Sequence, residues 1–388
     1  DTVEVVDSPN EDVADLEMLA GESPVIRYVN FLISLAVREG ASDIHICVGK
    51  PPMMRLNGEV LPVSADMPAL TAEQTKTLVY SALYGEQRGK FEENWELDCS
   101  FAITGVSRFR LNVLMARNGV EAVMRVIPSK IPTPEQLGLS PAIISLSQIP
   151  KGMVLVCGPT GSGKSTTLAA LLELINTKRK GHMLTIEDPI EFTYEAKSCI
   201  IRQREIGQHT KSFSNALRAA LREDPNVILV GEMRDLETIQ LTITAAETGH
   251  LTFATLHTQD APSTVDRIID VFPPHQQTQV RVQLAASLQG VVAQILLPRK
   301  DGRGRAAARE VMTMTPAISN LIREGKTHMI YSAIETGAKF GMIPMDRSLA
   351  MLVQQGVVAY DVAAAKARDQ EMFRKMCSQT AGAAGGGL

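Results

Sequence analysis

The spacing of apolar and polar residues changes near residue 150, and the change predicts two domains. Upstream, helical spacing of apolar positions alternates with period-two runs and Asn-Gly turns, which predicts a small α+β domain from Pro24 to about Pro128. Its expected elements are helices at 25–38 and 72–83, a strand at 43–47, and strand pairs around Asn57-Gly58 and Asn118-Gly119.

Downstream of Lys151 the pattern becomes a short apolar run, a turn and a helix, repeated. Continuous apolar strands that alternate with helices predict an α/β fold, with a mostly parallel sheet covered on both faces. The expected strands are 153–157, 183–186, 227–230 and 251–256, and the expected helices are 164–175, 213–222 and 236–247. After Pro273 the pattern predicts a mainly helical region.

Local composition sets the expected boundaries of these domains. Residues Asp1 to Glu22 include eight acidic residues and no Lys or Arg, which predicts a solvated leader. Prolines at 128, 132, 134 and 141 indicate a linker. We therefore expect a leader at 1–22, an N-terminal domain at 23–128, a linker at 129–150, a second domain at 151–370 that includes C-terminal helices, and a flexible tail at 371–388.

Overall composition bears on where the protein is located and on whether it binds zinc. The 388 residues are 45% apolar with a formal charge of −4, which is typical of globular proteins. Because no apolar run reaches the roughly eighteen residues of a membrane-spanning helix, we expect any membrane association to be peripheral. The five cysteines are scattered without a C-x-x-C pair, which indicates a reducing cytoplasm and no zinc site.

The strongest chemical signal is the run Gly158-Pro159-Thr160-Gly161-Ser162-Gly163-Lys164-Ser165, a P-loop between an apolar strand and a helix. In such a loop the backbone N–H groups surround phosphates, Lys164 reaches the β and γ oxygens, and Ser165 ligates Mg²⁺. The residues expected to bind ATP here are Gly158, Thr160, Gly161, Ser162, Gly163, Lys164, Ser165 and Thr166.

Carboxylates for hydrolysis follow two other predicted strands. Glu232 follows strand 227–230, at the edge where ligands bind in such sheets, and we expect it to act as the general base. Glu187, Asp188 and Glu191 form a second acidic cluster, in which Glu191 is the expected partner of Ser165 on Mg²⁺. The alternative for each of these residues is a solvated loop carboxylate.

Two histidines flank the strand at 251–256. His257 follows it directly and is expected to point towards the γ-phosphate, as a further catalytic residue. His250 precedes the strand, and for it a nucleotide contact and a structural role remain equally open.

These segments together resemble the secretion ATPase superfamily of P-loop NTPases, which includes pilus assembly, pilus retraction and type II secretion motors. The likeness covers roughly 23–370. The run 231–239 (GEMRDLETI) and the run 317–324 (AISNLIRE) are similar to the retraction, or PilT-like, branch, whose second box reads A-I-R-N-L-I-R-E. Ser319 replaces the first arginine of that box, which leaves the role of that position open. The acidic leader followed by Ser23 to Arg27 is instead similar to the assembly and secretion branches, although the chain lacks their tetracysteine zinc insert.

The resemblance implies a Mg²⁺-dependent hexameric ATPase with its ATP sites between subunits. It also implies an N-terminal PAS-like domain, a C-terminal RecA-like domain, and an inner-membrane pilus platform protein as partner. The expected function is type IV pilus retraction (twitching motility), performed in the cytoplasm at the inner membrane. Pilus assembly or type II secretion is the alternative. A nucleic-acid translocase is disfavoured by the net charge of −4, by 4% aromatic residues and by the lack of a long basic tract.

Three arginines of the first domain are candidates for completing a neighbouring subunit's site. Strand alternation puts Arg108 and Arg110 on one face, opposite Phe109, Leu111 and Val113, which we expect to be buried. If Asn118-Gly119 is a two-residue turn, Arg125 lies opposite Asn112 and diagonal to Arg110. Crowded guanidinium groups would attract an anion, or they pair with Asp98, Glu121 or other carboxylates. The resemblance implies arginine fingers, because the family's fingers lie in matching R-x-R-x-N and R-x-I-P segments.

The run 317–324 also carries a helical pattern of its own. Ala317, Ile318, Leu321 and Ile322 follow the spacing of one apolar stripe, which we expect to pack on the second domain. Arg323 and Glu324 lie off that stripe, and we expect them to couple the motor to its partner; an ordinary surface helix is the alternative.

Overall fold

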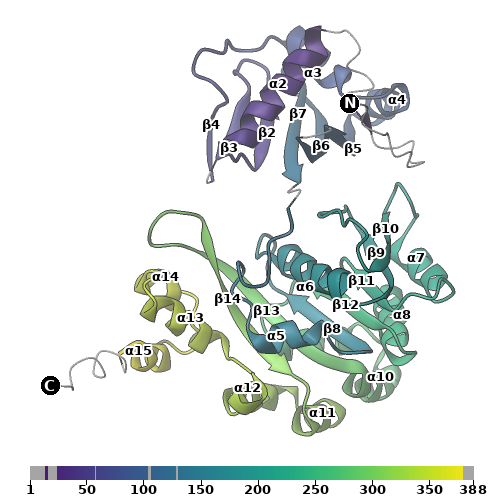
Figure 1. The fold of residues 1–388 in the computed structure, drawn as a ribbon, viewed down its shortest axis with the longest axis vertical. Coiled ribbons are helices and arrows are strands. Elements are labelled where there is room, and N and C mark those ends of the chain that lie inside the picture. The colour runs from purple at the N-terminus through teal and green to yellow at the C-terminus, as the bar shows by residue number, and fades with distance from the viewer. Residues whose placement is uncertain (1–13, 16–23, 57, 104–105, 128–129, 379–388) are drawn as a thin grey trace. The chain divides into compact units, whose positions relative to one another are not determined.

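The computed structural model describes residues 14–15, 24–56, 58–103, 106–127 and 130–378, which divide into a unit ending at Lys130 and a unit starting at Ile131 (Figure 1). In the leader, Ala14 and Asp15 form the short strand β1, while 1–13 and 16–23 lie outside the described residues. No helix in the described part of the chain is both long and apolar enough to cross a bilayer.

The first unit is an α+β fold whose strands are ordered β1-β5-β6-β7-β2-β3-β4. Helices α2 and α3 pack on its apolar face, where Phe109, Leu111 and Val113 are fully buried, as the alternation predicted. Helix α4 and strand β5 were not predicted. The elements are β1 (Ala14–Asp15), α2 (Pro24–Arg38), β2 (Asp43–Ile46), β3 (Met53–Leu56), β4 (Glu59–Pro62), α3 (Ala72–Ser81), α4 (Gly85–Asn94), β5 (Glu96–Ile103), β6 (Ser107–Ala116) and β7 (Gly119–Ile127).

The predicted register of the β6–β7 hairpin is wrong. Ala116 pairs with Gly119, so the turn is Arg117-Asn118 rather than Asn118-Gly119. This moves each cross-strand pair by two positions and leaves every side chain on its expected face, because side chains alternate with period two. Arg110 therefore lies directly opposite Arg125, not diagonal to it.

The second unit has the mixed α/β fold expected from its strand–helix repeats. Its sheet is ordered β10-β9-β11-β12-β8-β13-β14, parallel except for the antiparallel pair β13–β14. Side chains of β8 alternate between two cores: Met153 and Leu155 face α7 to α10, whereas Val154 and Val156 face α5 and α6. Figure 1 shows helices on both faces of this sheet.

The elements of the second unit extend beyond the predicted set. They are α5 (Pro141–Leu146), β8 (Gly152–Cys157), α6 (Lys164–Lys178), β9 (Gly181–Glu187), β10 (Cys199–Glu205), α7 (Phe213–Ala220), β11 (Val227–Val230), α8 (Leu236–Glu247), β12 (Leu251–Leu256), α9 (Ala261–Asp270), α10 (Pro274–Ser287), β13 (Leu288–Pro298), β14 (Arg305–Thr313), α11 (Pro316–Arg323), η1 (Thr327–Met329), α12 (Ile330–Glu335), η2 (Ala338–Phe340), α13 (Met345–Gln354), α14 (Tyr360–Ala364) and α15 (Gln370–Ser378).

Three sequence-based expectations about this unit need correction or completion. The region after Pro273 is mainly helical, as predicted, but the prediction missed β13 and β14, which complete the sheet. The expected linker, 129–150, contributes α5 and buries Leu139, Ile143 and Leu146 in the core against α6. The expected tail starts as helix α15, whose Phe373 is fully buried; 379–388 lie outside the described residues.

Candidate nucleotide site

The P-loop joins the buried strand β8 to the N-terminus of α6. Gly158, Gly161 and Gly163 adopt φ values of 142°, 76° and 84°, a region that L side chains rarely enter, and Gly163 is the N-cap of α6. This conformation presents backbone N–H groups and a helix N-terminus at one point, the arrangement that binds phosphates.

Lys164 lies inside this loop rather than in solvent. Its Nζ donates to the carbonyl oxygens of Gly158 at 2.8 Å and Pro159 at 3.1 Å. Burial lowers the pKa of Lys164, and the negative charges of Glu232 and Glu191 oppose that shift. The ammonium group is therefore held by the loop and feels the charges of Glu232, the predicted base, and of Glu191, the predicted Mg²⁺ ligand.

The other P-loop positions divide by exposure. Ser162 is buried, Ser165 and Thr166 are half-buried in the first turn of α6, and Thr160 is exposed at the tip of the loop. Ser165 is thus partly accessible in the first turn of α6, as a metal ligand there would need to be.

The predicted acidic cluster follows β9, at the same edge of the sheet. Glu187 is 7% exposed, and burial raises its pKa to about 7. The Glu191 N–H donates to Glu187 Oε2 at 3.4 Å, which folds the chain back after Asp188. Asp188 adds to the negative potential around Arg234, whose pKa is raised chiefly by Glu232.

Glu232 follows β11 and accepts two side-chain contacts. Arg234 Nη2 donates to Oε2 at 2.7 Å, and His257 Nε2 lies 3.0 Å from Oε1. The Arg234 hydrogen bond lowers the pKa of Glu232 against the effect of burial, so the carboxylate is charged at neutral pH. These three side chains, with Met233, Leu256, Thr258 and Arg267, line a pocket of about 260 Å³.

Backbone pairing puts Glu232 and His257 side by side. Gly231 N donates to Ile186 O at 2.8 Å and Met233 N donates to Thr255 O at 3.1 Å, which ties the chain after β11 to both neighbouring strands. The Thr255 hydroxyl also donates to Gly231 O. Since β12 separates β11 from β8, His257 lies between the P-loop strand and the Glu232 strand.

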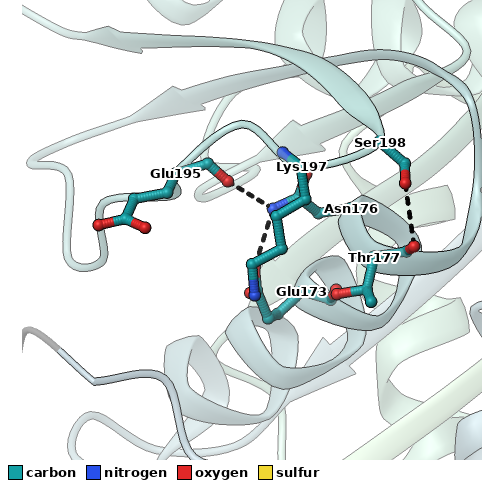
Figure 2. A network of polar contacts seen from close by, with 6 residues as sticks. All are labelled: Glu173, Asn176, Thr177, Glu195, Lys197 and Ser198. Carbon is teal, nitrogen blue, oxygen red and sulfur yellow. Dashed lines mark hydrogen bonds and ion pairs between the residues drawn. The ribbon is translucent and has the colours of Figure 1, made fainter.

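The chain after the acidic cluster is fastened to α6, as Figure 2 shows. Asn176 is fully buried; its Nδ2 donates to Glu195 O at 2.7 Å and its Oδ1 accepts from Lys197 N at 3.1 Å. Lys197 and Glu173 add an ion pair at the surface, and the Ser198 hydroxyl donates to Thr177 O at 3.0 Å. Helix α6, which starts with Lys164, thereby holds residues 195–198, a few positions after Glu191.

His250 lies away from this edge. It precedes β12 at the opposite end of the strand, and its Nδ1 contacts Ala245 O at 2.8 Å and the Thr248 hydroxyl at 3.3 Å. Within the chain, the His250 side chain contacts the backbone and a hydroxyl group at the C-terminal end of α8. A nucleotide contact for it stays a prediction.

The three predicted arginines share one face of the first unit's sheet. Arg125 Nε donates to Asp43 Oδ1 at 2.9 Å, Arg110 lies 3.7 Å from Asp98, and Arg108 Nη2 donates to the Ser100 hydroxyl at 3.2 Å. Asp98 was one of the expected partners. Glu121 accepts from Val48 N instead, and Asp43 was not foreseen as a partner.

Ser165 and Glu191 stay a prediction as protein ligands for Mg²⁺. The described residues contain no cluster of three or more His, Cys, Asp or Glu side chains able to hold a metal ion. Mg²⁺ usually takes one or two protein oxygens and completes its octahedron with water and phosphates, so a hydroxyl and a carboxylate fit this ion.

Sequence reasoning missed Arg234 and Arg267 in this pocket. Arg234 stands two residues after Glu232 in the quoted run, and a cation so close to a candidate base is a usable signal. Arg267 comes from α9, and nothing in its local sequence points to the pocket.

Comparisons with known proteins agree with this geometry. A family described as type II/IV secretion system protein matches residues 18–340. The chain belongs to this family. The type IV pilus retraction ATPase PilT of Pseudomonas aeruginosa is 51% identical over 342 residues, which cover 88% of this chain and 98% of that protein.

A twitching motility protein and a solved structure are also similar to the chain. A twitching motility protein of Neisseria gonorrhoeae is 49% identical over 82% of this chain and 85% of its own length. The crystal structure of the pilus retraction motor PilT with bound ADP superposes with a TM-score of 0.82 at 46% identity, covering 89% of this chain and 98% of that one. The family resemblance inferred from the motifs is confirmed.

Proposed function

We propose that this chain is a Mg²⁺-dependent ATPase that powers type IV pilus retraction. The observation that carries the proposal is the 51% identity to a retraction ATPase, which covers 98% of that relative. The P-loop and the pocket lined by Glu232 support it. The retraction-type runs 231–239 and 317–324 support retraction over assembly or type II secretion.

The described side chains support a division of labour in hydrolysis. Lys164 and the P-loop amides bind the phosphates, and bound Mg²⁺ would neutralise charge on the β and γ oxygens. Glu232 accepts a proton from the attacking water or orients that water, while Arg234 and His257 keep its carboxylate ionised and in place. A charged carboxylate with fixed neighbours is ready to act without reorganisation.

The assembly belongs to the same proposal. We propose a hexamer in which Arg108, Arg110 and Arg125 of a PAS-like N-terminal domain complete the ATP site of the RecA-like domain in a neighbouring subunit. The partner is an inner-membrane pilus platform protein, which the motor contacts from the cytoplasm. Arginine fingers act on charge that develops in the transition state, so they affect turnover more than affinity.

Deleting the gene tests the direction of force. Retraction predicts excess surface pili with lost twitching, and a plasmid copy restores motility while a Glu232→Gln copy does not. Absent pili would point to the assembly or secretion alternative. ATPase stimulation by DNA that weakens with salt would instead favour the translocase.

A further inference from the structure

Next to the P-loop lies a buried polar pair that sequence patterns did not reveal. Gln294 of β13 and Arg309 of β14 face each other across the antiparallel strands, with side chains only 2% and 8% exposed. β13 runs beside β8 with Ala293 opposite Cys157, so Gln294 is adjacent to the first residue of the loop.

The P-loop backbone packs directly on Gln294. A Cβ on Gly158 would come within 2.2 Å of the Gln294 carbonyl oxygen, and a Cβ on Gly163 would come within 2.9 Å of its Nε2. The first approach would require displacement of the β13 backbone, and the second would require a shift of the Gln294 side chain. These two glycines therefore bring the loop into contact with the strand, in addition to their effect on φ.

The Gln294 carboxamide bonds to the loop and to the helix that follows it. Nε2 donates to Ser162 O, and Oε1 accepts from the Thr167 hydroxyl at 2.8 Å. Because C=O and N–H point in opposite directions across a planar trans peptide, fixing Ser162 O on Gln294 turns the Gly163 N–H away from β13. Gln294 thus helps to orient a donor of the phosphate-binding loop.

Arg309 connects the same carboxamide to the start of the second unit. Its Nε donates to Gln294 Oε1 at 2.7 Å, and its Nη1 donates to Leu137 O at 3.0 Å and Gly138 O at 3.5 Å. Burial lowers its pKa to about 10, which still leaves the guanidinium charged at neutral pH. A buried charge held by neutral acceptors is expensive, so its presence suggests a role beyond filling space.

The segment bonded by Arg309 directly follows the boundary between the units. It begins at Ile131, the first residue of the second unit. Thr133 and Gln136 cap each other within it, with Gln136 Oε1 accepting from Thr133 N at 2.9 Å, and Leu139 anchors its end in the core. Segment 131–139 is thus held by its own hydrogen bonds, by Leu139 in the core and by the bonds from Arg309.

We propose that Gln294 and Arg309 are positioning residues that couple the P-loop to segment 131–139, so that nucleotide binding changes the restraint on the chain leading to the N-terminal unit. The inference rests on nucleotide binding at the P-loop, the first part of the proposed function, and adds a route from that site to the domain connection.

Hydrogen exchange on the full-length protein, with and without MgADP, tests this coupling. In the wild type, MgADP should slow exchange in both the P-loop and 131–139. Arg309→Met should keep the response in the P-loop and lose it in 131–139, because the bonds to Leu137 O and Gly138 O are gone. Arg303→Met, at an exposed arginine of the β13–β14 turn, should behave as the wild type.

Gln294→Glu separates the hydrogen bonds that Gln294 accepts from the one that it donates to the P-loop. Glutamate can still accept from Thr167 and Arg309, so the fold should persist, but its carboxylate cannot donate to Ser162 O. MgADP affinity should then fall about 3- to 10-fold, as expected for one lost hydrogen bond. The response of 131–139 should also disappear, even at saturating MgADP.

The outcomes separate coupling from simple structural support. A response of 131–139 that survives both Arg309→Met and Gln294→Glu would overturn the proposal, as would a wild type that responds in the P-loop alone. If Arg309→Met does not fold, Arg309→Lys, which keeps the charge but reaches fewer acceptors, should show a reduced response. A wild-type P-loop indifferent to MgADP would overturn nucleotide binding, and the coupling with it.

Discussion

At the scale of single residues, Glu232 is defined by the side chains on either side of it. Arg234 and His257 contact different oxygens of the same carboxylate, and both favour its ionised form. The group is therefore charged, oriented and partly shielded, which are the properties a general base or water-orienting residue requires.

Glu232→Gln should bind nucleotide and lose about 10²- to 10⁴-fold in turnover, because the amide cannot take up a proton. Phosphate release at saturating ATP and a separate binding titration measure the two effects. Glu237→Gln removes an exposed carboxylate from α8 and serves as the control. Near wild-type turnover in the Glu232 variant would show that another group does this work.

Arg234 should set the lower pH limit of activity. Its hydrogen bond is the main cause that lowers the pKa of Glu232, so removing it should raise that pKa. A base is active above its pKa, and the acid limb of kcat/KM in Arg234→Met should therefore move to higher pH. Arg267→Met removes a charge from the same pocket without breaking a bond to Glu232, and a matching shift there would refute the specific role of Arg234.

At the scale of elements, helix α11 has one face buried against the core and one face exposed to solvent. Ile318 and Ile322 are fully buried and Leu321 is partly buried against the core, but Ala317 is exposed, so the apolar stripe is narrower than predicted. Ser319, which replaces an arginine of the family box, donates to Ala285 O at 3.1 Å.

The exposed polar side chains of α11 contact one another and the residues that directly follow the helix. Arg323 Nη2 donates to the Ser319 hydroxyl at 2.8 Å, Asn320 donates to Glu324 at 2.7 Å, and Lys326 lies 2.7 Å from Glu324. The charges of this helix are thus oriented at the surface, where a partner can reach them.

Arg323→Ala should leave ATPase activity unchanged and abolish twitching. The reason is position: Arg323 is exposed and its contact is to Ser319, remote in sequence from the P-loop and the Glu232 pocket. Phosphate release and colony spreading give the two readings, with the exposed Arg303→Ala as the comparison. Normal spreading by the Arg323 variant would leave α11 as an ordinary surface helix.

At the scale of the whole molecule, the sheet face that carries Arg108, Arg110 and Arg125 belongs to the first unit, whereas the nucleotide site belongs to the second. Arg110 and Arg125 stand opposite each other and are each next to an aspartate, Asp98 and Asp43. The Arg110–Asp98 pair is exposed and contributes little to stability, so Arg110 can exchange its partner for an anion at small cost. Asp43 is buried and also pairs with Arg55, so Arg55 keeps this carboxylate paired when Arg125 turns to an anion.

Mixing subunits tests whether arginines act between neighbours. Rings made only of Arg110→Ala or only of Glu232→Gln subunits should be nearly inactive. Mixed rings should recover part of the activity, because an intact Glu232 can then meet an intact Arg110 from the next subunit. Co-purification of two differently tagged variants shows that mixing has occurred; rings proved to be mixed but inactive would exclude this arrangement.

Local sequence was sufficient for the parts of the site that lie within a few residues of one another. The P-loop, the position of Glu232 after β11 and that of His257 after β12 follow from short motifs and strand ends, because parallel strands present their carboxyl ends at one edge. The buried face of β6 likewise followed from period-two alternation, which survives a two-residue change of register.

Tertiary structure decided whatever depends on pairing between distant segments. The apolar run 288–298 fits a strand or a buried helix equally well, and only its place beside β8 made it the strand that carries Gln294. Arg309 reads as a surface residue in sequence, yet it is buried because β14 sets it opposite Gln294 and beside Leu137. Sequence thus determined which chemistry the chain carries, whereas long-range packing determined what supports it, because burial and cross-strand neighbours are properties of the folded chain alone.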